Sequence, residues 1–285
     1  MKLKYHLVNV FTRGGRLTGN PLCVFEDGSN LGTEAMQALA RQFNLSETTF
    51  ILPSSRATAR VRIFTPDFEM PFAGHPTLGT AHVVRALQAT PADTVTLEMQ
   101  AGLIPVQARG DLWTLTANAA THRDIEVPVA DLAAALGLRT SDIVAETGGR
   151  RPLWVNAGSD QLVVPLVDAA AVNRVAPEAA RLATLRSAQG RQLAYVFAEA
   201  GDGDVLSRFL FEAGGAFRED PATGSACANL GGWYLATGAT VPLVRRVHQG
   251  ERVHRPSELL LSIDAARRVR VGGRVVSLGT GEIEP

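Results

Sequence analysis

The sequence predicts an α+β protein made of two similar, strand-rich halves, each holding one buried helix. Three observations support this prediction. The chain has 285 residues, enough for one large domain or two medium ones. The pattern Pro-x-x-Gly occurs twice, beginning at Pro71 and at Pro221, 150 positions apart. Each copy precedes a stretch so apolar that, as a helix, it must be surrounded by protein.

The two copies of the motif also share their surroundings. A strand-like run that begins with Arg and contains Phe precedes each copy, at residues 62–64 and 208–210. The apolar stretch after the second copy is interrupted mainly by Asn229 and by glycines. Duplication explains these matches better than coincidence. We therefore place the halves at residues 1–118 and 119–273, with the last strand, 274–285, as a candidate to complete the first half.

Hydrophobic periodicity gives the elements of the first half. Apolar residues at helical spacing predict an amphipathic helix over Thr33–Phe43 that ends at Asn44. Short β-branched or aromatic runs bounded by turn residues predict strands. These runs are Tyr5–Phe11, Pro21–Phe25, Thr48–Leu52, Ala59–Phe64, Val95–Met99, Ile104–Ala108 and Trp113–Ala117.

The second half shows the same mixture of elements. Helical patterns occur at Val129–Leu136, with Gly137 as the C-cap, and at Pro177–Ala188. Strands are predicted at Gln192–Ala198, Val205–Phe211 and Glu258–Ile263.

Charge and composition exclude several classes of partner. The chain has 28 basic and 28 acidic residues, which argues against nucleic acid, because a phosphate backbone is held mainly by surplus Lys and Arg. No run of about 18 apolar residues exists, so no membrane-spanning helix is expected. The start of the chain lacks the apolar region of a signal peptide. Two widely spaced cysteines fit a reducing compartment, so we expect a cytoplasmic protein.

Common cofactor and metal motifs are not supported. Gly279-x-Gly281 has no following helix and is therefore no dinucleotide loop. His248 and His254 are six residues apart, which is not a metal-binding spacing.

The two helix entrances are the first candidate site. Pro76 suits the first position of a helix, which makes His75 its N-cap and Ser225 the N-cap of the second helix. Helix N-termini attract anions, and Gly74 and Gly224 would let a ligand approach the backbone closely. Two such entrances facing one another across a cleft would hold a small carboxylate compound, with Asp220 also lining the cleft.

Each of these residues also has a purely structural explanation. A serine can cap its helix, an aspartate can sit in a turn before proline, and a histidine can be a satisfied core residue; only the matched pair of motifs favours a site. Glu47 lies between a helix and an apolar strand. Pattern alone places it on the surface, although a carboxylate sheltered from water would suit acid/base catalysis.

Four segments together resemble the PhzF family of phenazine-biosynthesis isomerases, and the resemblance runs from about Tyr5 to the glycine pair at 272–273. The segments are Gly19-Asn20-Pro21, Asn44-Leu45-Ser46-Glu47-Thr48, Phe64-Thr65-Pro66 running to Pro71-Phe72-Ala73-Gly74-His75-Pro76, and Glu219-Asp220-Pro221-Ala222-Thr223-Gly224-Ser225-Ala226. The last of them and Pro-Phe-Ala-Gly-His-Pro are specific to this family.

The resemblance implies the diaminopimelate-epimerase fold, in which each half is a curved, mainly antiparallel sheet wrapped around a central helix, with the active site between the halves. It also implies a homodimer and chemistry without metal or cofactor. By the same resemblance Glu47 is the proton-transfer residue, in place of the surface role that the pattern suggests. The substrate-binding residues it implies are Gly74, His75, Asp220, Gly224 and Ser225.

The leading hypothesis is therefore a cofactor-independent isomerase that moves a proton within a small carboxylic acid, similar to trans-2,3-dihydro-3-hydroxyanthranilate isomerase. One alternative is a two-base amino-acid epimerase or racemase with opposed thiols. Its cysteines would fall near Gly74 and Asp220, where the chain has no sulfur, and Cys227 lies a turn inside the helix. A second alternative is a metabolite-binding or interaction module without catalysis.

Overall fold

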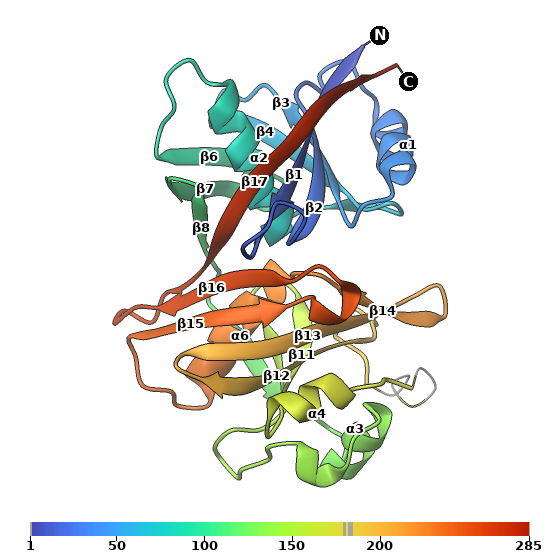
Figure 1. The fold of residues 1–285 in the computed structure, drawn as a ribbon, viewed down its shortest axis with the longest axis vertical. Coiled ribbons are helices and arrows are strands. Elements are labelled where there is room, and N and C mark those ends of the chain that lie inside the picture. The colour runs from blue at the N-terminus through green and yellow to red at the C-terminus, as the bar shows by residue number, and fades with distance from the viewer. Residues whose placement is uncertain (1, 179–180, 182–184, 285) are drawn as a thin grey trace. The chain divides into compact units, whose positions relative to one another are not determined.

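The computed structural model describes residues 2–178, 181 and 185–284, which form two compact units (Figure 1). Unit 1 comprises Met1–Thr116 together with Gly272–Pro285, and unit 2 comprises Ala117–Val271. The last strand, β17 (Val269–Ile283), begins in unit 2 and continues through unit 1. The chain therefore returns at its end to the unit in which it began.

Unit 1 is mostly strand. Its helices are α1 (Thr33–Phe43) and α2 (Gly74–Leu87). Its other strands are β1 (Leu3–Val10), β2 (Asn20–Phe25), β3 (Thr48–Leu52), β4 (Ala59–Phe64), β5 (Glu69–Met70), β6 (Thr94–Met99), β7 (Gly102–Arg109) and β8 (Leu112–Thr116). β1 pairs antiparallel with both β2 and β17, so the two ends of the chain lie close together (Figure 1).

Unit 2 has the same mixture of elements. Its helices are α3 (Val129–Ala135), α4 (Ala169–Arg174) and α6 (Gly224–Ala236), with short 3-10 turns η1 (Thr140–Asp142) and η2 (Glu251–Val253). Its strands are β9 (Thr121–Asp124), β10 (Leu153–Asn156), β11 (Asp160–Pro165), β12 (Leu193–Gly201), β13 (Asp204–Ala213), β14 (Ala216–Asp220), β15 (Leu243–Gln249) and β16 (Ser257–Ile263).

The two units repeat one order of strand pairing. In unit 1 the order is antiparallel β1–β2, parallel β2–β3, antiparallel β3–β4 and β4–β5, parallel β4–β6 and antiparallel β6–β7. In unit 2 the same senses follow one another in β10–β11, β11–β12, β12–β13, β13–β14, β13–β15 and β15–β16. The internal repeat predicted from the Pro-x-x-Gly motifs is therefore confirmed in the topology, and each unit is an α+β structure with mainly antiparallel strands.

The helix that follows each motif is buried, as its apolar sequence predicts. α2 contacts strands β1 to β4 and β6 to β8, and its first eight residues are all buried. α6 contacts β9, β10, β11 and β16, and it is buried from Ala226 to Tyr234. Glycines allow this close packing: a Cβ atom at Gly79 would lie 2.5 Å from the Leu22 side chain, and one at Gly231 would lie 2.5 Å from Val269.

Helix α1 confirms the amphipathic pattern of Thr33–Phe43. It buries Met36, Leu39 and Ala40 in a core that also contains Phe25 and Phe50. The helix ends where the sequence predicts, because Asn44 takes a left-handed conformation and its N–H bonds to a carbonyl in the last turn.

Other element predictions need correction. The helix over 129–136 ends one residue early, so Leu136 is the C-cap and Gly137 follows it with a φ of 69°. Of the helix predicted over Pro177–Ala188, positions 179–180 and 182–184 lie outside the described residues, and 185–188 are not helical. The N–H of Ser187 bonds instead to the Arg191 carbonyl, which forms a turn. None of the helices in the described part of the chain is long and apolar enough to span a membrane.

Candidate active site

Both central helices begin two residues earlier than their sequences predict, which corrects the expected caps. The N-cap residues are Ala73 and Thr223, whose backbones are extended and whose carbonyls accept a hydrogen bond from the N–H four residues later. His75 and Ser225 are therefore second helical residues, not N-caps. Pro76 fits the third position, because the first four N–H groups of a helix lack a helical partner and a missing one costs little there.

Glu47 lies in the short connection between α1 and β3. The left-handed Asn44 turns the chain at the end of the helix, and the buried Thr48 begins the strand. The next residue, Thr49, forms a 2.8 Å hydroxyl–hydroxyl hydrogen bond with Thr80 of α2. This bond fixes the strand that follows Glu47 against the helix that carries His75.

The structure brings Glu47 and His75 into direct contact. Nδ1 of His75 lies 2.9 Å from Oε2 of Glu47, and the two side chains are 4% and 17% exposed. The interpretation of Glu47 as a surface residue is therefore wrong. Nε2 of His75 lies 3.1 Å from the carbonyl oxygen of Pro21. Because a carbonyl only accepts hydrogen bonds, this contact requires a proton on Nε2.

The carboxylate of Glu47 has unused hydrogen-bonding capacity. Its Oε2 atom is buried, and no described residue forms a hydrogen bond with it, although Nδ1 of His75 lies 2.9 Å away. A buried acceptor in this state is costly. A bound molecule that donates a proton or hydrogen bond to Oε2 would remove this cost.

A tight turn at Gly19 positions the Pro21 carbonyl, which accepts the hydrogen bond from His75. Gly19 has a φ of 77°, and a Cβ atom there would collide with the Val10 carbonyl oxygen. Only glycine fits, since it lacks a side chain and tolerates positive φ. Asn20 then pairs with Val10 and begins β2, which places the Pro21 carbonyl at the imidazole.

In unit 2, Asp220 lies at the end of β14 in a network of side chains. The Thr223 hydroxyl donates to Oδ2 of Asp220, and it accepts no hydrogen bond from the N–H groups of its own helix. Gln249, which is buried, donates from Nε2 to the Asp220 carbonyl at 2.8 Å and to the Thr223 hydroxyl at 3.0 Å. A Cβ atom at Gly250 would lie 2.5 Å from the Pro221 carbonyl oxygen, so a larger residue would disturb this turn.

The other unit 2 candidates lie in the first turn of α6. Gly224 is its first residue and is buried, as Gly74 is in α2. The Ser225 hydroxyl accepts a hydrogen bond from Nε2 of Gln161 at 3.0 Å. Sequence reasoning missed Gln161 and Gln249. The available signal was Asn229, a polar residue in an otherwise apolar helix, which bonds to Gln161 at 2.8 Å.

Neither thiol is available as a base. Cys23 and Cys227 are unpaired and buried, and burial raises the pKa of both. Among the residues that the structure describes, no three His, Cys, Asp or Glu side chains gather closely enough to hold a metal ion.

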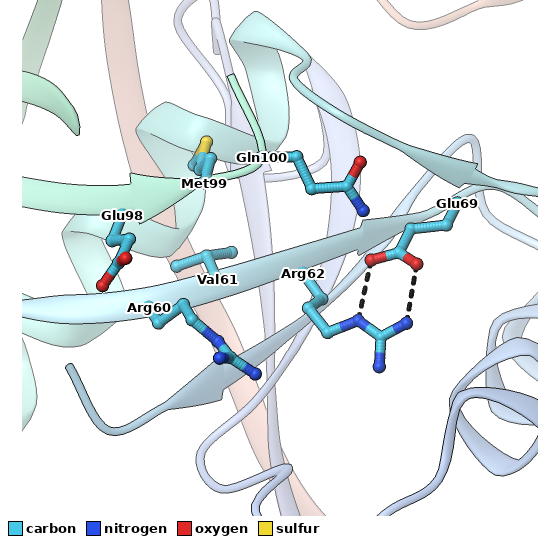
Figure 2. Close-up of a pocket in the computed structure, with 7 residues that line it drawn as sticks. All are labelled: Arg60, Val61, Arg62, Glu69, Glu98, Met99 and Gln100. Atoms are coloured by element: carbon cyan, nitrogen blue, oxygen red, sulfur yellow. Dashed lines mark hydrogen bonds and ion pairs between the residues drawn. The ribbon is translucent and has the colours of Figure 1, made fainter. Parts of the chain in front are cut away.

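A separate pocket of about 280 Å³ lies in unit 1 (Figure 2). Its lining residues are Arg60, Val61, Arg62, Glu69, Glu98, Met99 and Gln100. Arg62 donates two hydrogen bonds to Glu69, at 2.7 and 2.6 Å, so these two charges satisfy each other. None of the predicted site residues lines this pocket.

Sequence comparisons with known proteins extend over both units. The family model PhzC-PhzF, described as phenazine biosynthesis-like protein, matches residues 8–281. An uncharacterized isomerase of Pasteurella multocida is 40% identical over 98% of this chain and 93% of its own length. The trans-2,3-dihydro-3-hydroxyanthranilate isomerase of Pseudomonas aeruginosa is 33% identical over 92% of this chain and 91% of its own.

Solved structures share the fold. A PhzF-family phenazine biosynthesis protein of Bacillus anthracis superposes with a TM-score of 0.85 at 22% identity, covering 100% of both chains. A hydroxyproline epimerase of Agrobacterium vitis superposes with a TM-score of 0.64 at 16% identity, over 99% of this chain and 92% of the other. At these identities, both comparisons concern the fold alone.

Proposed function

The chain belongs to the PhzC-PhzF family and is an isomerase, and we propose that it uses Glu47 to move a proton within a small carboxylic acid. The observation that carries this proposal is the buried Oε2 of Glu47, 2.9 Å from Nδ1 of His75 and without a hydrogen-bond partner among the described residues. The relatives' activity sets aside the alternative of a non-catalytic binding module.

The reaction requires Glu47 to be stable in two protonation states. As a carboxylate it takes a proton from a substrate carbon, and the electron pair left behind delocalises into the neighbouring unsaturated system. As a carboxylic acid it returns the proton to another carbon, so atoms and electrons balance without an oxidant. His75 suits both states, because with Nε2 protonated against Pro21 its Nδ1 can carry a proton toward the carboxylate or accept one from the acid.

We propose a substrate related to that of the Pseudomonas relatives, with a carboxylate on an unsaturated ring. By the family resemblance His75, Asp220 and Ser225 bind and orient it, and the first helical residues, Gly74 and Gly224, let it approach the backbone. We further propose that each unit curves its sheet around its central helix. Catalysis would need neither metal nor cofactor, and the protein would form a homodimer. Two unpaired thiols support a reducing, cytoplasmic location.

Replacing Glu47 tests this function. We expect Glu47→Gln to reduce kcat for trans-2,3-dihydro-3-hydroxyanthranilate by about 10²- to 10⁴-fold, because general acid/base catalysis contributes that much. Turnover is followed by the disappearance of substrate in a chromatographic assay, and circular dichroism checks the fold. Glu34→Gln is the matched control, because Glu34 is exposed in the first turn of α1. Full turnover by the Glu47 variant would contradict the assignment.

A further inference from the structure

We infer that Gln161, held by Asn229, is a positioning residue that fixes the Ser225 hydroxyl as a hydrogen-bond donor to bound substrate. The inference rests on the proposed function, which gives Ser225 its substrate-binding role. All of the residues involved belong to unit 2.

The two amides are buried beside the entrance of α6. Gln161 on β11 is 2% exposed, and Asn229, one turn after Ser225 along the helix, is fully buried. Burying an amide is unfavourable unless its groups are hydrogen-bonded. The direction of each of their bonds therefore matters.

The backbone fixes the orientation of Asn229. The N–H of Ala157 donates to Oδ1 of Asn229 at 2.8 Å, and Nδ2 donates to the Ser159 carbonyl at 2.8 Å. A backbone N–H can only donate and a carbonyl can only accept, so these two bonds decide which end of the amide is oxygen. The second hydrogen on Nδ2 points to Oε1 of Gln161, at 2.8 Å.

The orientation of Asn229 fixes that of Gln161, which in turn fixes the hydroxyl of Ser225; we call this chain of hydrogen bonds the relay. Because Oε1 of Gln161 accepts from Asn229, Nε2 faces the Ser225 hydroxyl and donates to it at 3.0 Å. A hydroxyl has one hydrogen to donate. Since Gln161 offers Ser225 a hydrogen, the hydroxyl's own hydrogen points elsewhere. Ser225 is thereby preset to donate to an acceptor such as a substrate carboxylate.

Unit 1 shows that the fold does not need this polar pair. Asn229 lies five positions after Gly224, and the residue five positions after Gly74 in α2 is Gly79. The atom nearest a Cβ at Gly79 belongs to the apolar Leu22 on β2. The same place in the repeat is thus apolar in one unit and doubly polar in the other. The amide pair is therefore a feature of unit 2 alone, where it joins the connection between β10 and β11 to Ser225.

Replacing Gln161 with glutamate reverses the direction of the hydrogen bond between residue 161 and Ser225. The carboxylate offers no hydrogen, so Ser225 turns its own hydrogen toward residue 161 and away from substrate. In Gln161→Glu we expect KM for trans-2,3-dihydro-3-hydroxyanthranilate to rise at least tenfold, with kcat changed less than threefold. Gln107→Glu is the matched control, because Gln107 is exposed on β7. Gln161→Met, which keeps the volume without a donor or a charge, replaces the glutamate variant if that variant does not fold.

A double variant separates this role from simple charge repulsion. If Gln161 acts through Ser225, then Gln161→Glu in a Ser225→Ala background raises KM by less than threefold beyond Ser225→Ala alone. The inference would be overturned if the increases in KM caused by the two substitutions multiplied in the double variant. An unchanged KM in the single Gln161 variant would also overturn it.

A measurement without substrate distinguishes failure of the inference from failure of the proposed function. The side-chain amide of Gln161 in the full-length, 15N-labelled protein is assigned by its absence from the Gln161→Glu spectrum. We expect its hydrogens to exchange slowly in the wild type and at least tenfold faster in Ser225→Ala. If the wild-type protein does not turn over the test compound, the proposed function fails, while this exchange still decides the hydrogen bond. Exchange that Ser225→Ala leaves unchanged would refute the relay.

Discussion

Burial decides which side chains of this protein can transfer protons at neutral pH. Cys23 and Cys227 are both fully buried, and desolvation raises the pKa of each thiol. The thiolate is the form that acts as base or nucleophile, so neither residue suits that role. A two-thiol epimerase mechanism is therefore disfavoured by the residues themselves, although proteins with epimerase activity share the fold.

The thiols should be inert in the folded protein. We expect no measurable reaction of either cysteine with Ellman's reagent at pH 7.5 over an hour, and undiminished isomerase turnover afterwards. Because the pKa of both groups is raised, the thiolate remains scarce on going from pH 7.5 to pH 9. The same protein in 8 M urea, a denaturing concentration chosen as the positive control, should react at both positions. Rapid labelling of the folded chain with loss of turnover would restore the thiol mechanism.

The same dependence on burial limits what the sequence could predict for Glu47. Its neighbours in the chain look like an ordinary helix-to-strand connection, so periodicity places it on the surface. It is sheltered by contact with His75, 28 positions later, and no local pattern encodes that contact. Only the family resemblance pointed to it. His75 itself was found from the motif, but its hydrogen bond to the Pro21 carbonyl depends on the turn at Gly19.

At the scale of elements, the central helices depend on the absence of side chains. Gly79 faces β1 and β2 so closely that its Cβ would lie 2.5 Å from Leu22, 2.9 Å from Val10 and 3.2 Å from Val8. Glycine is normally unfavourable inside a helix by about 1 kcal/mol relative to alanine. Its presence here indicates that packing against the strands outweighs this preference.

Gly79→Ala tests that balance. Overpacking a core costs about 1–3 kcal/mol, so we expect a net loss of about 1 kcal/mol or more in the free energy of unfolding despite the gain in helix propensity. Urea denaturation followed by circular dichroism measures it. Gly279→Ala is the control, because a Cβ there meets nothing within 4 Å and its φ is ordinary; its stability should be equal to the wild type or higher. Equal stability of the Gly79 variant would contradict the packing argument.

Elements with a clear local pattern were predicted well, and those without one were not. α1, β3 and β4 have the predicted bounds, because helical spacing marks the helix and runs of β-branched or aromatic residues mark the strands. β11 was missed since it begins with two polar residues and ends in proline, which leaves only a short apolar run. The helix entrances were misplaced by two residues, since proline was taken as the first helical residue when the extended Ala73 already ends the preceding segment.

At the scale of the molecule, the two units share one arrangement of strands but carry different polar side chains. Unit 1 carries the Glu47–His75 pair, and unit 2 carries Asp220 and Ser225 with their supporting amides. The repeat could be inferred from sequence because both copies keep the Pro-x-x-Gly entrance. The polar network of unit 2 could not, because it depends on side chains brought together from four separate elements, β11, β14, α6 and β15.

The returning strand is expected to be essential to unit 1. Its residues 275–283 pair with β1 over the whole length of that strand. Deleting residues 272–285 should therefore expose the edge of β1, and we expect hydrogen exchange measured by mass spectrometry to become fast in β1 and β2. Exchange in β12 and β13 of unit 2 should change far less. Unchanged protection of β1 in the truncated chain would contradict this role.

The central claim is that Glu47 carries the proton, and isomerisation in deuterium oxide tests it most directly. With the wild-type protein and trans-2,3-dihydro-3-hydroxyanthranilate, we predict product with at most one deuterium, located at the carbon that receives the proton. With Glu47→Gln, we predict that product formation and exchange of the substrate C–H into solvent, both followed by NMR, fall by about 10²- to 10⁴-fold. Product formation or C–H exchange in that variant at the wild-type rate would contradict the account.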